Sequence, residues 1–253
     1  MVWFLLPIII VPGMLLVLLI RPDPKTIAQN LEQYYPGYVE PETAPGAVAV
    51  GGGLRDLLGN YPLATAFANS FAALGTMSMM MTMTSLALDH HGYGLSLISA
   101  SVSLHVVGMF GFSIPFGRLS DRLGRRNVML IGNGIIALGS VLVGTSSDYI
   151  VITVGTFLVG LGWSCVNVAS SALITEVVGP AERGRAIGVS DTISQASTIL
   201  LPLAGGPLVE WAGLPILAVV SLAVLAGPVI LLSRLREPSP GIYAHGSSGE
   251  VTV

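Results

Sequence analysis

Long apolar segments dominate this sequence and restrict the folds that it can adopt. A helix needs about 20 consecutive, mostly apolar residues to cross the hydrocarbon core of a bilayer. Segments of about this length occur at residues 2–20, 63–88, 95–116, 128–147, 149–174, 186–209 and 213–233. They are too long for strands and lack the alternation of a transmembrane β-barrel. The chain is therefore predicted to be an all-α membrane protein with seven transmembrane helices.

The composition supports an integral membrane protein. Of the 253 residues 52% are hydrophobic and only 10% are charged, whereas soluble domains carry about 25% charged residues. So few charges cannot cover a surface that faces water. The single cysteine, Cys165, lies in an apolar run, so no internal disulfide forms and the thiol is expected to be buried or to face lipid. No cofactor, metal or nucleic-acid partner is expected, and the sequence has no enzyme motif.

The distribution of basic residues predicts the orientation. If the seven segments span the membrane, every lysine and arginine lies on one side of it. These eleven residues are Arg21, Lys25, Arg55, Arg118, Arg122, Arg125, Arg126, Arg183, Arg185, Arg234 and Arg236. Basic residues accumulate in cytoplasmic loops. The chain is therefore predicted to cross the cytoplasmic membrane with its N-terminus outside the cell and its C-terminus in the cytoplasm. The first segment is interpreted as a true span, since no basic residue precedes it and no cleavage site follows.

The most polar stretch is "GRLSDRLGRR", residues 117–126, predicted to be a short cytoplasmic loop between the third and fourth spans. Arginines at this position anchor to lipid headgroups, and any basic loop would do the same. Gly117 and Gly124 permit tight turns. Asp121 offers an acceptor to a helix N-terminus or to an arginine.

This stretch closely resembles the signature loop of major facilitator superfamily transporters, G-x-L-A/S-D-R-x-G-R-R/K. The matching residues are Gly117, Leu119, Asp121, Arg122, Gly124, Arg125 and Arg126. The sequence around it resembles that of drug- and metabolite-exporter-like members. The resemblance implies a role for these residues in gating.

The resemblance also implies a domain organisation. Such transporters have twelve helices in two six-helix halves joined by a long cytoplasmic loop. Residues 1–20 then correspond to helix six, 21–62 to the central loop, 63–233 to the six-helix C-terminal half-bundle, and 234–253 to a disordered cytoplasmic tail. The first five helices have no counterpart in this sequence, and the N-terminal half is expected as a partner, in cis or in trans.

Polar residues within the predicted spans are candidates for coupling or substrate binding, because such groups are costly in lipid. His105 is either a proton or substrate site or a neutral histidine that bridges two helices. Asp191, with Gln195 on the same helical face, is either a coupling carboxylate or a surface acid paired with Arg183 or Arg185. The three remaining candidates, which either line a cavity or pack helices, are Asn69, Asn133 and Asn167.

The leading hypothesis is a secondary transporter that exports small molecules with proton coupling, by alternating access. It would work in the lipid bilayer on a small-molecule substrate and would need both halves. One alternative is a non-transporting scaffold or regulatory half that pairs with another polypeptide, and a less favoured one is a heptahelical receptor. Because the usual partner of the signature aspartate lies on the absent helix five, Asp121 is expected to contact only local arginines.

Overall fold

A computed structural model describes residues 6–22, 26–27, 30–37, 53–179 and 182–235. Its regular elements are helices, which confirms the predicted all-α class. The chain divides into two compact units, residues 1–42 and 43–253.

The first unit contains α1 (Leu6–Leu18) and α3 (Leu31–Tyr34). Helix α1 has 13 residues, fewer than the 20 or so that cross a bilayer, and residues 1–5 lie outside the described part of the chain. The predicted span at 2–20 therefore stays a prediction. Residues 38–52 of the predicted central loop and residues 236–253 of the predicted tail also lie outside it.

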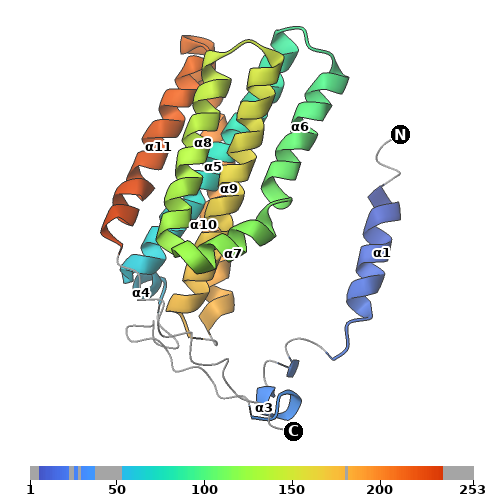
Figure 1. Cartoon of the computed structure of the whole chain (residues 1–253), viewed down its shortest axis with the longest axis vertical. Helices are drawn as coiled ribbons and strands as arrows, with labels where there is room; N and C mark the ends of the chain where they lie inside the picture. The colour runs from blue at the N-terminus through green and yellow to red at the C-terminus, as the bar shows by residue number, and fades with distance from the viewer. Residues whose placement is uncertain (1–5, 23–25, 28–29, 38–52, 180–181, 236–253) are drawn as a thin grey trace. The chain divides into compact units, whose positions relative to one another are not determined.

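The second unit is a bundle of long helices that run up and down along one axis (Figure 1). Its helices are α4 (Leu54–Gly59), α5 (Tyr61–His90), α6 (Leu95–Phe110), α7 (Ser113–Leu123), α8 (Arg125–Thr145), α9 (Tyr149–Val177), α10 (Arg183–Ala212) and α11 (Pro215–Arg234). Helix α9 packs against α5, α6 and α8, while α10 packs against α5, and α11 against α8 and α5. The long helices alternate in direction along the chain (Figure 1).

Five stretches of the bundle are long and apolar enough to cross a membrane: α5, α6 with α7 (Leu95–Leu123), α8, α9 and α11. They correspond to five of the seven predicted spans. Helix α10, which contains the predicted span at 186–209, has 30 residues and runs beside the others (Figure 1). Its composition is more polar, and the polar residues it carries form part of the site described below.

The basic residues of the bundle gather at one end. That end holds α4, α7, the starts of α8 and α10, and the last turn of α11. It carries Arg55, Arg118, Arg122, Arg125, Arg126, Arg183, Arg185 and Arg234. The described turns at the opposite end, at 91–94, 146–148 and 213–214, contain no lysine or arginine. The one-sided charge expected from the sequence is thus present in the folded bundle.

Helices α8 and α9 touch through glycines. A Cβ atom built on Gly139 would lie 2.5 Å from the carbonyl oxygen of Gly155, and one on Gly162 would lie 2.6 Å from the carbonyl oxygen of Gly132. Real Cβ atoms do not approach so closely, so these positions require glycine. Small residues allow such close packing of helices in a membrane. Gly206 on α10, in contrast, has open space around it.

The signature stretch is mostly helical, so the prediction of a loop over residues 117–126 is wrong. Helix α6 stops at Phe110, α7 continues to Leu123, and Gly124 is the single residue between α7 and α8. Gly124 has φ 87°, as expected for a turn glycine, but Gly117 lies inside α7 and makes no turn. The cause is Pro115, which cannot donate a hydrogen bond to the carbonyl of residue 111 and so interrupts α6.

Candidate functional site

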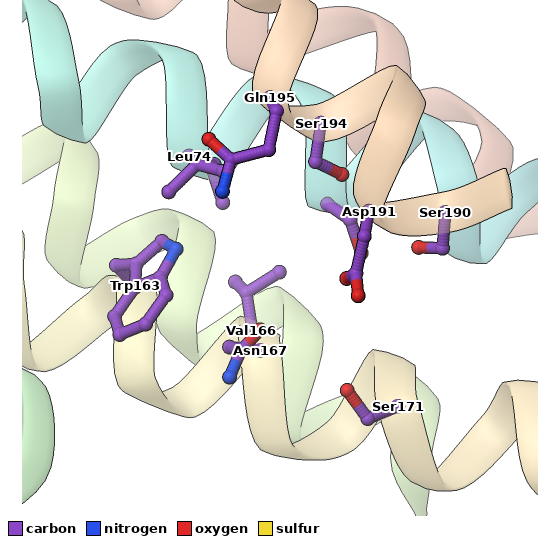
Figure 2. A pocket seen from close by; sticks show the side chains of 11 residues that line it. Leu74, Trp163, Val166, Asn167, Ser171, Ser190, Asp191, Ser194 and Gln195 are labelled. Carbon is purple, nitrogen blue, oxygen red and sulfur yellow. The ribbon is translucent and has the colours of Figure 1, made fainter. Parts of the chain in front are cut away.

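A polar hollow lies between α5, α9 and α10. It has a volume of about 130 Å³ and is lined by Ser70, Ala73, Leu74, Trp163, Val166, Asn167, Ser171, Ser190, Asp191, Ser194 and Gln195. Figure 2 shows the side chains of α10 facing those of α9 across it. It is open on one side, because Asn167, Ser171, Asp191 and Gln195 are all exposed.

Helical spacing explains how these residues meet. Trp163, Asn167 and Ser171 follow one another at intervals of four on α9, so they share one face. Asp191 and Gln195 share a face of α10 in the same way. Because α10 returns antiparallel to α9, the two faces meet over two turns of helix. Of the polar candidates predicted from the sequence, the structure brings together Asn167, Asp191 and Gln195.

Asp191 has no ion-pair partner among the described residues. The two arginines expected to pair with it are engaged elsewhere. Arg185 lies 3.1 Å from a carboxylate oxygen of Glu182, and Arg183 Nε donates to the carbonyl of Thr175 at 3.0 Å. In the described structure Asp191 is therefore not paired with either arginine, and it lines the hollow.

Asn69 and Asn133 lie outside the hollow and contact each other. Asn133 Nδ2 donates to Asn69 Oδ1 at 2.8 Å, and Asn69 Nδ2 donates to the carbonyl of Thr65 at 2.9 Å. Both side chains are buried, and the pair joins α5 to α8. The oxygen of Asn133 finds no partner among the described residues. In this arrangement the two amides pack helices.

His105 also lies away from the hollow, between α6 and α9. It is fully buried, and its Nδ1 lies 2.7 Å from the carbonyl oxygen of Thr156. Because a carbonyl only accepts, Nδ1 carries the proton of this contact, and in a neutral ring Nε2 is then a bare acceptor. Nε2 has no partner in the described part of the chain. The geometry matches the helix-bridging interpretation of this histidine.

The signature residues build an ion-pair cluster at the basic end of the bundle. Arg125 lies 2.7 Å from Asp121 and 2.6 Å from Glu176, and so ties α7 and α8 to the end of α9. Arg126 Nε donates to the carbonyl of Leu232 on α11 at 2.8 Å. The expected contact of Asp121 with a local arginine is confirmed.

The remaining signature residues take different positions. Leu119 packs against the apolar core, whereas Arg122 is exposed.

Some site residues were not anticipated from the sequence. Ser190 and Ser194 line the hollow beside Asp191 and Gln195, and their spacing of four was a usable signal. Ser70 contributes from α5. Glu176 was missed as the partner of Arg125. It follows the predicted span at 149–174 on the side of the membrane that also carries the signature stretch, which was a usable signal.

Comparison with known proteins identifies the family. Residues 65–250 match the Major Facilitator Superfamily. Over 236 residues the chain is 26% identical to an uncharacterized MFS-type transporter, YddS, of Bacillus subtilis, covering 90% of the chain and 52% of that protein. Over 218 residues it is 29% identical to an uncharacterized MFS-type transporter, Rv1877, of Mycobacterium tuberculosis, covering 81% of the chain and 31% of that protein.

A third relative has a named substrate. The chain is 28% identical over 152 residues to the riboflavin transporter RfnT of Brucella anthropi, covering 57% of the chain and 38% of that protein. The chain thus spans between about a third and about a half of the length of these relatives. The match over most of the chain confirms the resemblance drawn from the signature stretch: this chain belongs to the Major Facilitator Superfamily.

Proposed function

We propose that the chain forms one half of a secondary transporter that exports small molecules by alternating access, coupled to protons. The observation that carries this proposal is the hollow between α5, α9 and α10. It gathers several amides and hydroxyls around a carboxylate that has no ion-pair partner among the described residues, on an open face of the bundle. Polar groups at membrane depth usually face a substrate path or a water-filled cavity.

The hollow forms one wall of such a path. Its volume of about 130 Å³ is below the 300 Å³ or more typical of sites that enclose small molecules. In the proposed transporter, a second set of helices, in cis or in trans, supplies the opposite wall, and the substrate site lies between the two near the bilayer midplane. The length of the relatives supports this arrangement.

The proposed topology has seven spans. Residues 1–20 form the first, 21–62 a cytoplasmic loop, 63–233 the six-span half-bundle with α10 among its spans, and 234–253 a cytoplasmic tail. The arginines at one end of the bundle support a cytoplasmic location for that end, which puts the N-terminus outside.

Asp191 is the proposed coupling group. It faces the hollow without an arginine partner among the described residues, so a proton or a substrate can reach it. The sequence contains no G-x-x-x-x-G-K-[ST] stretch that would bind ATP phosphates, which favours an ion gradient as the energy source. The signature cluster at Arg125 would hold the cytoplasmic ends of α7, α8 and α9 together during the cycle.

A scaffold or regulatory half that pairs with another polypeptide is the second candidate. The open side of the hollow is equally compatible with it, because a second polypeptide could cover that side. The two functions differ in whether the assembled protein moves solutes.

Everted membrane vesicles can decide between them. The chain is produced alone and together with any coding sequence found in frame upstream of Met1, and uptake of a panel of small amphipathic compounds is followed with an imposed pH gradient. We expect uptake that a protonophore abolishes and that Asp191→Asn reduces at least tenfold. Glu210→Gln, near the other end of α10, is the matched control and should leave uptake unchanged.

Two outcomes would overturn the transporter assignment. The first is the absence of gradient-dependent uptake in both forms. The second is stable association with another polypeptide without any flux, which would support the scaffold.

A further inference from the structure

We infer that the hollow binds an organic monocation, with its charge beside Asp191 and its apolar part against Trp163 and Leu74. The inference deepens the proposed function and rests on it for the idea that the ligand is transported. It names the chemical class of ligand for this site.

The charge of the hollow favours a cation. Among the described residues that line it, Asp191 is the single charged one. The nearest basic residues on its own helix are held by Glu182 and by the carbonyl of Thr175, and Arg125 on α8 is held by Asp121 and Glu176. A positive charge beside this carboxylate is attracted to it, and near a protein surface the attraction is stronger than in bulk water. An anionic ligand would meet an uncompensated repulsion.

The polar groups around Asp191 favour an organic ligand with hydrogen-bonding groups. Figure 2 shows Gln195 one turn further along α10 and Asn167 on α9, with both side chains at the edge of the hollow. Ser194 adds a second observation. It is only 5% exposed, it lines the hollow, and its Oγ has no hydrogen-bond partner in the described chain. A buried hydroxyl without a partner is costly, so a ligand or water that reaches it is favoured.

The apolar side of the hollow suits the body of an amphipathic cation. Trp163 lies near the middle of α9, and its ring is held by an edge contact with Phe110 at a centroid distance of 6.0 Å. An indole is the side chain that attracts cations most strongly through its π face. Leu74 and Val166 complete the apolar lining. The small volume holds a cationic head group, while the rest of the ligand projects through the open side.

The experiment uses the full 253-residue chain in lipid nanodiscs and equilibrium dialysis of three labelled probes. Benzyltrimethylammonium carries a positive charge, benzyl alcohol is neutral and benzenesulfonate is negative. Empty nanodiscs correct for partition into lipid. The variants are Asp191→Asn, Asp191→Glu and Trp163→Leu. The control is Glu210→Gln, which also removes a carboxylate from α10 but at a position outside the hollow. Circular dichroism confirms that each variant keeps its helix content.

We expect saturable binding of the cation alone, at one site per chain. Asp191→Asn should raise its Kd about tenfold or more, as loss of a charge-assisted contact implies. Asp191→Glu should stay within a few fold of the parent chain, Trp163→Leu should weaken binding severalfold, and Glu210→Gln should not change it.

The inference is overturned if the folded parent chain does not bind the cation, if Asp191→Asn binds it equally well, or if benzenesulfonate binds as tightly. The result separates this inference from the proposed function. Binding of the cation that depends on Asp191, without gradient-driven flux, would refute transport alone. Flux that ignores the charge of the solute would refute the inference alone.

Discussion

The glycine contact between α8 and α9 allows a sharp test of the packing. In Gly139→Ala the new methyl group would lie 2.5 Å from the carbonyl oxygen of Gly155 and 2.9 Å from the amide nitrogen and Cγ2 of Val159. A carbon–oxygen contact needs about 3.3 Å, so the two helices must separate by roughly 0.8 Å. A gap of that size forfeits a quarter to a half of each dispersion contact along the seam. Overpacking of this kind costs about 1–3 kcal/mol.

Gly134→Ala is the matched control. Gly134 lies on the same helix and has no atom within 4 Å of its built Cβ. Both substitutions share the same change in helix propensity, about 1 kcal/mol in favour of alanine, so their difference isolates the contact. The measurement is equilibrium unfolding by titration with sodium dodecyl sulfate in mixed micelles, followed by circular dichroism. The free energy of unfolding of Gly139→Ala should be about 2 kcal/mol lower than that of Gly134→Ala.

The reciprocal contact adds a second readout. A Cβ on Gly155 would lie 2.9 Å from the carbonyl oxygen of Gly139. Once either substitution has separated the helices, the methyl group of the other causes less steric overlap. The double variant should therefore lose less free energy of unfolding than the sum of the losses of the two single variants. Equal stability of Gly139→Ala and Gly134→Ala, within about 0.5 kcal/mol, would refute the close approach of α8 and α9.

Two further contacts give predictions that the same titration checks. In the ion-pair cluster on Arg125, Glu176→Gln should destabilise the bundle more than Asp121→Asn, because the Glu176 side chain is 33% exposed and that of Asp121 is 69% exposed and exposed pairs contribute less than about 1 kcal/mol. Equal losses would contradict this ranking. In the buried amide pair, Asn133→Leu should lose about 1–3 kcal/mol because Asn69 is left without its partner, and adding Asn69→Leu should cost less than the first change did. A double variant that loses the full sum would show that the amides act independently.

Much of the bundle could be predicted from the sequence, because the thickness of a bilayer fixes the length of an apolar helix. The segments at 63–88, 149–174 and 186–209 all lie inside observed helices. The turn at Gly124 and the contact of Asp121 with a nearby arginine were also predictable, since both depend on residues close together in the chain.

The helix α7 was missed because its signals are short and local. Pro115 removes one hydrogen bond from the end of α6, and Phe116 and Leu119 then pack against the core while Arg118 and Arg122 stay exposed. The cluster of charge in the motif favoured a loop. Apolar residues that recur every three or four positions, with charged residues between them, are equally compatible with an amphipathic helix at the edge of the membrane.

The site could be predicted only in part, because its residues come from different helices. The faces carrying Asn167 and Asp191 were each visible as spacings of four, but the sequence does not say that α9 and α10 place them opposite each other. The same limit applies to the pair of Asn69 and Asn133, which are 64 residues apart and face each other only because α5 packs against α8.

The most direct test of the central claim is whether water reaches the hollow from both sides of the membrane. The single native cysteine, Cys165, is fully buried, so a cysteine introduced as Gln195→Cys can be labelled selectively with a membrane-impermeant maleimide. Leu222→Cys, at an exposed apolar position of α11, serves as the lipid-facing control. Labelling is compared in intact cells and in everted vesicles made from them, with the chain produced alone and together with any coding sequence found in frame upstream of Met1.

The proposed transporter predicts that Gln195→Cys reacts in both preparations while Leu222→Cys reacts in neither, because a thiol in lipid does not form the reactive thiolate. A Gln195→Cys variant as unreactive as Leu222→Cys in both preparations would contradict the assignment of this hollow as a transport path.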